Sequence, residues 1–134
     1  MSDLTLRPIG HVESALTDVA AAPRQPDEAA PDAWLVLTDA YVPALDGLTA
    51  GDDVLLFTWL DRADRAALAV HPRGDRTRPL TGVFATRSPG RPNPIGLHTV
   101  HILAIDGARV HVRELEALDG TPVLDIKPIL TGER

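Results

Sequence analysis

Three short stretches of the sequence carry side chains whose types and spacing could bind a charged ligand. The longest, "TRSPGRPNP", spans residues 86–94 and alternates prolines with two arginines and an asparagine. Proline fixes its own backbone angle, so these prolines lower the entropy cost of holding Arg87, Arg91 and Asn93 in place. A guanidinium can donate two parallel hydrogen bonds to a carboxylate. We therefore predict a ligand-binding loop here rather than a plain connector between strands.

The two other stretches are shorter. "PRQP" places Arg24 and Gln25 between two prolines, where the guanidinium can donate to a carboxylate and the amide can both donate and accept. "LDGTPVLDIKP", residues 118–128, opens with an Asp-Gly turn and continues into an apolar strand. Asp125 and Lys127 share one face of that strand, where they form either a surface ion pair or the edge of a site.

Charge is distributed unevenly along the chain. The net charge of the 134 residues is −6, yet residues 71–93 hold five arginines and one aspartate, a local charge of +4. Broad nucleic-acid binding normally requires a basic surface, so the overall charge argues against that class. The local excess favours an anionic or electron-rich ligand. The absence of cysteine excludes disulfides, thiolate nucleophiles and cysteine metal sites.

Other chemistries have little support in the sequence. The five histidines have no metal-ligand spacing on a predicted helix, and we expect no bound metal. None of the three serines lies in a G-x-S-x-G motif, and neither a P-loop nor a G-x-G-x-x-G pattern occurs. No apolar run is long enough to span a membrane, and the first residues do not resemble a signal peptide. We therefore expect a cytoplasmic protein.

The elements that position these loops are predicted to be short β-strands. Apolar and alternating runs predict strands at 4–12, 33–39, 52–60, 80–87 and 122–126, and a hairpin around Asp106-Gly107. One short helix is expected at 61–69, and residues 17–32 are typical of a long loop. Strands of this length and spacing predict a mainly β domain, either a small barrel or a sandwich.

Four segments taken together, "PIGHVES", "PRQP", "GVFATRSPGRPNPIGL" and "LDGTPVLDIKP", resemble the TsaA/TrmO family of S-adenosylmethionine-dependent methyltransferases. They follow the family's order and cover the chain from Pro8 to Pro128. The resemblance implies a single-sheet small β-barrel, and we expect at most one or two short helices. From the length we expect one domain over residues 1–134, without the C-terminal extension domain of larger family members. It also implies a homodimer that holds its cofactor, S-adenosyl-L-methionine, in loops near the subunit interface.

The resemblance assigns cofactor binding to three loops: Arg24 and Gln25; Arg87, Ser88, Pro89, Arg91 and Asn93; and Leu118, Asp119, Gly120, Thr121 and Pro122. Methyl transfer from a sulfonium is an in-line displacement, so the protein mainly aligns the reactants and excludes water. An amine acceptor must also lose a proton to a nearby group. Asp125 and Asp119 are our candidates for that group, and Asp119 is equally consistent with a plain turn residue.

Three activities are compatible with these residues. The family's best-known activity, N6-methylation of threonylcarbamoyl-adenosine beside the tRNA anticodon, is our first expectation. The family usually has an aromatic residue where this chain has Gly90, a tyrosine where it has Ile129, and histidines around "DDVLLFTWL". These departures favour, as an alternative, a methyltransferase of the same fold that acts on a small metabolite or natural product. The lack of an unmistakable general base leaves a third reading, a non-catalytic S-adenosylmethionine-binding protein.

Overall fold

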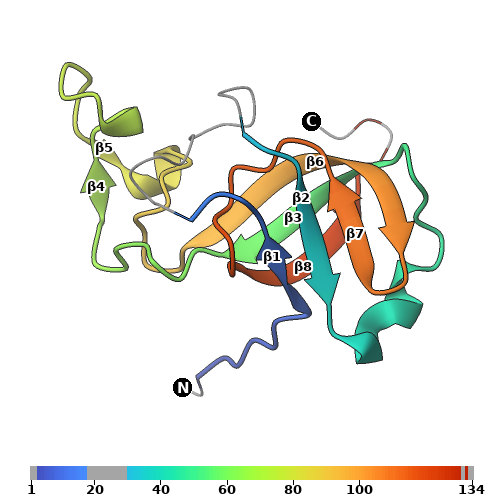
Figure 1. The fold of residues 1–134 in the computed structure, drawn as a ribbon. Helices are drawn as coiled ribbons and strands as arrows, with labels where there is room; N and C mark the ends of the chain where they lie inside the picture. The colour runs from blue at the N-terminus through green and yellow to red at the C-terminus, as the bar shows by residue number, and fades with distance from the viewer. Residues whose placement is uncertain (1–2, 18–29, 131, 133–134) are drawn as a thin grey trace.

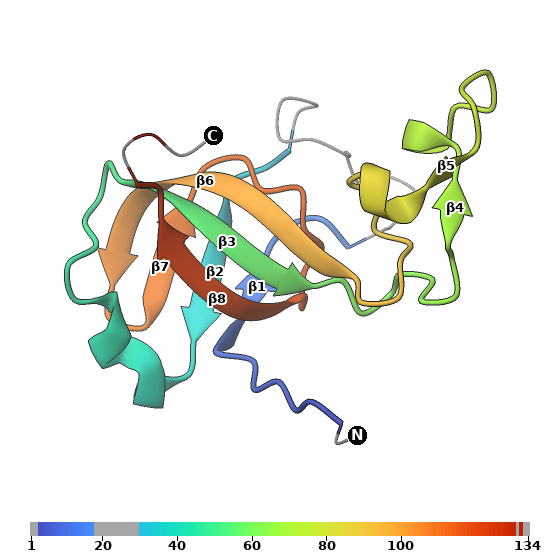
Figure 2. The same ribbon diagram turned by 180° about the vertical axis from the view of Figure 1, so that it is seen from behind.

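The fold is a closed barrel of six antiparallel strands in the order β1-β2-β7-β6-β3-β8. The computed structural model describes residues 3–17, 30–130 and 132. A second, two-stranded sheet extends to one side of the barrel (Figure 1 and, from behind, Figure 2). The strands are β1 (Gly10–Glu13), β2 (Ala33–Leu37), β3 (Asp53–Trp59), β4 (Ala69–Val70), β5 (Thr81–Gly82), β6 (Ile95–Asp106), β7 (Arg109–Val112) and β8 (Pro122–Pro128). The mainly β barrel predicted above is confirmed, with β4-β5 as an addition to its single sheet.

Helical structure is limited to short 3-10 segments in the described residues: η2 (Asp39–Leu45), η3 (Pro72–Gly74) and η4 (Val83–Ala85). The predicted helix at 61–69 is wrong, because that segment is a series of turns. The Asp64 carboxylate accepts a hydrogen bond from the Ala66 amide at 2.9 Å, and the Asp64 carbonyl accepts one from the Arg91 amide at 3.0 Å. Both bonds take up groups that a helix would need for its own ladder.

The hairpin prediction is confirmed. Asp106 pairs with Arg109 across a two-residue loop, and Gly107, the first residue of that loop, has a φ of 58°, the positive value that a type II′ turn requires there. Two strand predictions are only partly right. The first strand begins at Gly10 rather than Leu4, and residues 80–87 contribute only Thr81 and Gly82 before the chain turns into η4.

The barrel interior is filled by aliphatic side chains from every barrel strand. Alternation along β3 and β6 directs one set inward, so that Val54 faces Val100 and Leu56 faces His98. The fully buried positions include Val12, Leu35, Leu56, Ile102, Val110, Val112, Leu115 and Val123. This core fixes the strands whose ends and outer faces carry the site.

A bulge in β8 changes which side chains point outward. Phe57 of β3 pairs with Asp125 and the next residue, Thr58, pairs with Val123, so Leu124 has no partner of its own. The bulge places Asp125 on the outer face of the barrel while Val123 stays buried. Leu124 is therefore free to contribute to a surface groove.

Candidate functional site

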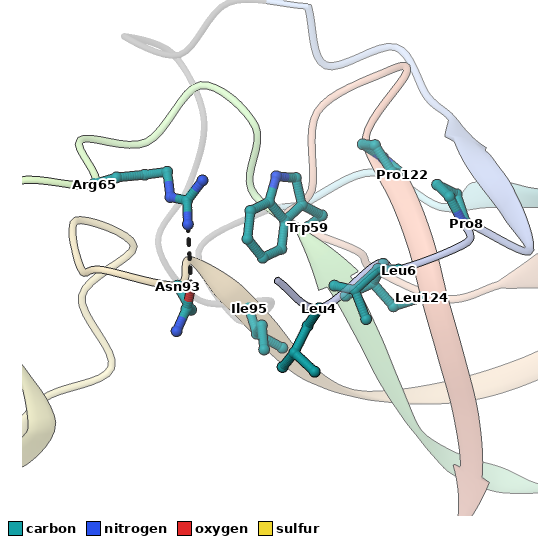
Figure 3. Close-up of a pocket in the computed structure, with 9 residues that line it drawn as sticks. All are labelled: Leu4, Leu6, Pro8, Trp59, Arg65, Asn93, Ile95, Pro122 and Leu124. Atoms are coloured by element: carbon teal, nitrogen blue, oxygen red, sulfur yellow. Dashed lines mark hydrogen bonds between the residues drawn. The ribbon is translucent and has the colours of Figure 1, made fainter. Parts of the chain in front are cut away.

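A groove of about 460 Å³ lies on the outside of the barrel, between the end of β3, the start of β6, the start of β8 and the N-terminal segment (Figure 3). Its lining is mainly apolar, with one guanidinium and one carboxamide. The lining residues are Leu4, Leu6, Pro8, Trp59, Arg65, Asn93, Ile95, Pro122 and Leu124. We call it the Trp59 groove. A volume of this size is within the range of small-molecule sites.

Arg65 forms the polar edge of the groove. Its Nε donates to the Pro92 carbonyl at 2.8 Å, and its Nη2 donates to Asn93 Oδ1 at 3.2 Å. The guanidinium carbon lies 5.1 Å from the centre of the Trp59 ring, a cation–π distance. Figure 3 shows the guanidinium and the indole side by side above Asn93. These contacts orient the Asn93 side chain through its oxygen, which leaves its NH₂ group available to a ligand.

The loop before Asn93 folds around a different arginine. The half-buried Arg91 guanidinium donates to the carbonyls of Val83 and Thr86, and the Ser88 amide donates to Thr86 Oγ1 at 3.1 Å. Arg91 therefore holds the loop in shape, a role that the sequence did not indicate. Arg87 is exposed, and within the described part of the chain its side chain makes no hydrogen bond or ion pair. Pro89 is exposed as well.

The predicted Asp-Gly turn is tied to β1 and the segment that follows it. The amides of Asp119 and Gly120 donate to the carbonyls of Leu16 and Val12, each at 2.7 Å, and Gly120 has a φ of 83°. Asp119 Oδ1 accepts from the Ser14 amide at 3.0 Å. A second set of bonds closes the turn: Thr121 donates to the Leu118 carbonyl from its amide at 3.1 Å and from its hydroxyl at 2.7 Å. The turn delivers Pro122 to the Trp59 groove.

The predicted residues therefore fall into separate groups. Asn93 and Pro122, from two different loops, meet in the Trp59 groove. Asp125 is not among the groove residues; its carboxylate lies 3.5 Å from the Lys127 ammonium, and both side chains are more than half exposed. Arg24 and Gln25 lie outside the described residues.

Of the nine residues that line the groove, sequence reasoning identified only Asn93 and Pro122, and the two most distinctive residues that it missed are Trp59 and Arg65. Trp59 is the last residue of strand β3, in which inward and outward side chains alternate. That alternation does indicate that the Trp59 side chain points outward. Arg65 belongs to the segment that we expected to be helical, so its position beside Trp59 had no sequence signal. Nothing in the sequence indicated that His98, one of the five histidines, is buried and bonded to Glu116.

The shifted pKa values belong to surface groups away from the groove. The hydrogen bond from Arg109 and the positive charge of that guanidinium lower the pKa of Glu13. The same hydrogen bond and the negative charge of Glu13 raise the pKa of Arg109. Hydrogen bonds from Thr77 lower the pKa of Asp75.

No helix in the described residues is long and apolar enough to cross a membrane. Within the same residues, no group of three or more histidine, aspartate or glutamate side chains is arranged to hold a metal ion.

Comparison with known proteins adds a family match. The family model described as "tRNA-methyltransferase O N-terminal domain" matches residues 11–132. A "Probable S-adenosyl-L-methionine-binding protein" of Methanothermobacter thermautotrophicus is 42% identical over 130 residues, which make up 96% of this chain and 93% of that protein. An "S-adenosyl-L-methionine-binding protein" of Archaeoglobus fulgidus is 41% identical over 124 residues, or 92% of this chain and 88% of that protein.

A solved structure has the same fold. The crystal structure of TrmO from Pseudomonas aeruginosa matches 96% of this chain with a TM-score of 0.74 and 34% sequence identity. The match covers 57% of that TrmO chain, so this chain spans a little more than half the length of its solved relative.

Proposed function

The chain belongs to the family of tRNA-methyltransferase O N-terminal domains, and we propose that it methylates the N6 atom of N6-threonylcarbamoyladenosine beside the anticodon of tRNA. As a member of this family it is an S-adenosyl-L-methionine-binding methyltransferase. The observation that supports the proposal most is the convergence of Asn93 and Pro122, from the two loops that resemble the family's cofactor loops, in the Trp59 groove.

The groove suits S-adenosyl-L-methionine in size and in chemistry. Its aliphatic and indole walls would cover the apolar parts of a nucleoside, and its polar edge offers the Asn93 amide and the Arg65 guanidinium. A carboxylate such as that of the methionine moiety is well matched to a guanidinium. Arg87, which is exposed and has no bond to another described residue, is a second guanidinium that could reach a bound anion. We assign the remaining loop residues, Ser88, Pro89, Arg91, Leu118, Asp119, Gly120 and Thr121, to holding these groups in position, and Arg24 and Gln25 to the cofactor as in the family.

The chemistry asks little of the protein beyond alignment. When bound, S-adenosyl-L-methionine supplies a methyl group on a good neutral leaving group. The chain's own residues then hold the acceptor in line and keep water away, which the apolar walls at Trp59, Ile95 and Leu124 favour. A carboxylate that accepts the acceptor's proton would contribute roughly 10²- to 10⁴-fold in rate.

Two aspartates are candidates for that carboxylate, and they have different surroundings. Asp119 Oδ1 is engaged by the Ser14 amide, so this side chain also holds its turn. Asp125 is paired with Lys127 on the outer face. Asp125→Asn and Asp119→Asn distinguish them: the base variant should lose methyl transfer at saturating substrate while it binds the cofactor normally. A variant with unchanged turnover is not the base.

We also propose that the chain acts as a homodimer with the site near the interface. Three apolar side chains that line the groove are exposed, Leu4 at 95%, Leu6 at 54% and Ile95 at 45%, and so is Leu97 at 38%, two residues after Ile95 on β6. An apolar surface of this kind commonly marks a contact with another protein. Sedimentation should give twice the monomer mass, and Leu97→Glu should shift it toward the monomer while Thr99→Glu, on the same strand face, has less effect. A monomeric wild-type protein contradicts this part of the proposal.

The activity test compares acceptors. Labelled methyl from S-adenosyl-L-methionine should appear in unfractionated tRNA, and digestion should place it in the modified adenosine. Transfer that requires tRNA carrying the threonylcarbamoyl group supports the proposal. Cofactor binding without transfer to any tRNA overturns it.

One observation favours a second candidate, a methyltransferase that acts on a small metabolite or natural product. The chain carries a net charge of −6, and seven of the nine residues that line the groove are apolar. A polyanion such as tRNA gains less from this surface than a small uncharged acceptor would. Transfer to a small-molecule extract but not to tRNA would select this candidate.

A further inference from the structure

Three polar side chains form a hydrogen-bonded chain that begins in the mainly aliphatic interior of the barrel. Thr58 Oγ1 lies 2.8 Å from His98 Nε2, and His98 Nδ1 lies 2.5 Å from Glu116 Oε1. Thr58 is 0% and His98 6% exposed. With the proton on Nδ1, His98 donates to Glu116 Oε1, and Nε2 then accepts from the Thr58 hydroxyl. The chain therefore joins strands β3 and β6 to the segment before β8.

Each of the three residues is close in sequence to a part of the proposed site. Thr58 immediately precedes Trp59, and His98 is on the same strand that begins after Asn93. Glu116 is two residues before the turn at 118–122, which delivers Pro122 to the groove. The chain thus connects, inside the barrel, the three segments that meet outside it in the Trp59 groove.

The other hydrogen bonds that hold the turn at 118–122 go to β1 and the residues that follow it. Its backbone bonds go to Val12 and Leu16, and its Asp119 carboxylate is bound by Ser14. Those bonds place the turn relative to β1 but not relative to β6. Among the described residues, Glu116 provides the side-chain bond from this segment to β6.

Stability alone gives little reason for polar groups here. A buried ionic or hydrogen-bonded pair often stabilises a fold no more than apolar side chains of the same volume would. Among the described residues, the buried Glu116 Oε2 has no hydrogen-bond partner, which adds a desolvation cost. Glycine at position 96 leaves room for the contact between Thr58 and His98. A Cβ at this position would collide with Thr58 Oγ1 and lie 2.8 Å from His98 Nε2.

We propose that Thr58, His98 and Glu116 are positioning residues, which hold the 118–122 turn in register with Asn93 and so set the affinity of the Trp59 groove for S-adenosyl-L-methionine without touching it. This inference rests on the proposed function for its ligand. The positioning itself is a property of the free protein, so it can be measured separately.

The main test compares Glu116→Leu, which removes the link, with Glu116→Gln, whose amide oxygen can still accept from His98. Calorimetry with S-adenosyl-L-methionine should show an affinity about tenfold lower for Glu116→Leu, because small displacements of a binding group are costly, and near the wild-type value for Glu116→Gln. Glu116→Leu should also lose some thermal stability, because it leaves the buried Nδ1–H of His98 without an acceptor, whereas Glu116→Gln should stay close to the wild type; binding is therefore measured well below the unfolding midpoint. Thr58→Val should act like Glu116→Leu, and the double variant should lose no more than either alone. Thr99→Val, outward on β6, is the matched control.

A second measurement needs no ligand. Hydrogen exchange at the Asp119 and Gly120 amides should be faster in Glu116→Leu and Thr58→Val than in the wild type and in Thr99→Val. Unchanged exchange, or equal affinity in Glu116→Leu and the wild type, overturns the inference. So does a Glu116→Gln variant as weak as Glu116→Leu. A wild-type protein that binds no S-adenosyl-L-methionine contradicts the proposed function instead, and the exchange data still decide whether the chain positions the turn.

Discussion

Replacing Arg91 by alanine should destabilise the loop at 83–94 in the free protein, with no cofactor bound. The Arg91 guanidinium donates to two backbone carbonyls, those of Val83 and Thr86. The Val83 carbonyl keeps two other donors in the variant, the Thr86 amide at 3.1 Å and the Thr86 hydroxyl at 3.0 Å. Within the described residues, the Thr86 carbonyl loses its partner. The expected loss is therefore that of about one hydrogen bond to a charged group.

That loss is about 2 kcal/mol, since hydrogen bonds to charged groups contribute roughly 1.5–3 kcal/mol. If the loop unfolds together with the barrel, the midpoint of thermal unfolding should fall by about 6 °C for a chain of this length. If the loop opens separately, exchange of the Ser88 and Arg91 backbone amides should become faster by about thirtyfold. Arg91→Lys should not restore the wild type, because one ammonium cannot reproduce a fork across two carbonyls.

The control is Arg87→Ala, which removes an exposed guanidinium of the same loop that has no bond in the described residues. It should leave both unfolding and exchange unchanged. The reasoning is refuted if Arg91→Ala keeps the stability and loop exchange of the free wild-type protein but loses cofactor affinity. Arg91 would then act as a direct clamp on the cofactor.

Three further predictions follow from single contacts. Gly96→Ala should destabilise the fold by more than about 1 kcal/mol in urea unfolding, because the new Cβ meets Thr58 inside the barrel. Trp59→Ala should weaken binding of S-adenosylhomocysteine in calorimetry, because it removes the largest apolar wall of the groove. Arg109→Ala should raise the pKa of Glu13 toward its ordinary value in an NMR titration. Because the folded-state pKa of Glu13 is lowered, this pair stabilises the fold above the ordinary carboxyl pKa, and the contribution is lost as the pH falls through the folded-state value.

The parts of the fold that depend on local chemistry could be predicted from the sequence. Asp106-Gly107 fixes its hairpin by the φ that only glycine adopts readily, and the alternation of Val110 and Val112 defines the inward face of β7. Residues 61–69 could not be predicted in this way. Their helical pattern is outweighed by the Asp64 carboxylate and by the bond from Arg91, which is remote in sequence.

The sequence allowed us to predict which loops contribute to the site, but not which side chains contact one another there. The prolines around Asn93 and the turn at Gly120 identify segments that hold a fixed shape, and both segments lie next to the groove. The contact of Trp59 with Arg65 depends on how turns pack after β3, which no local pattern reports. The bond between His98 and Glu116 joins residues 18 apart on different elements, and only the closed barrel brings them together.

The most direct test of where this chain binds its cofactor is a crystal structure with S-adenosylhomocysteine. The product should occupy the Trp59 groove, with its carboxylate near a guanidinium of Arg65 or Arg87 and with Asn93 and Pro122 in contact. Density for the product at another surface, with this groove empty, would contradict the site proposed here.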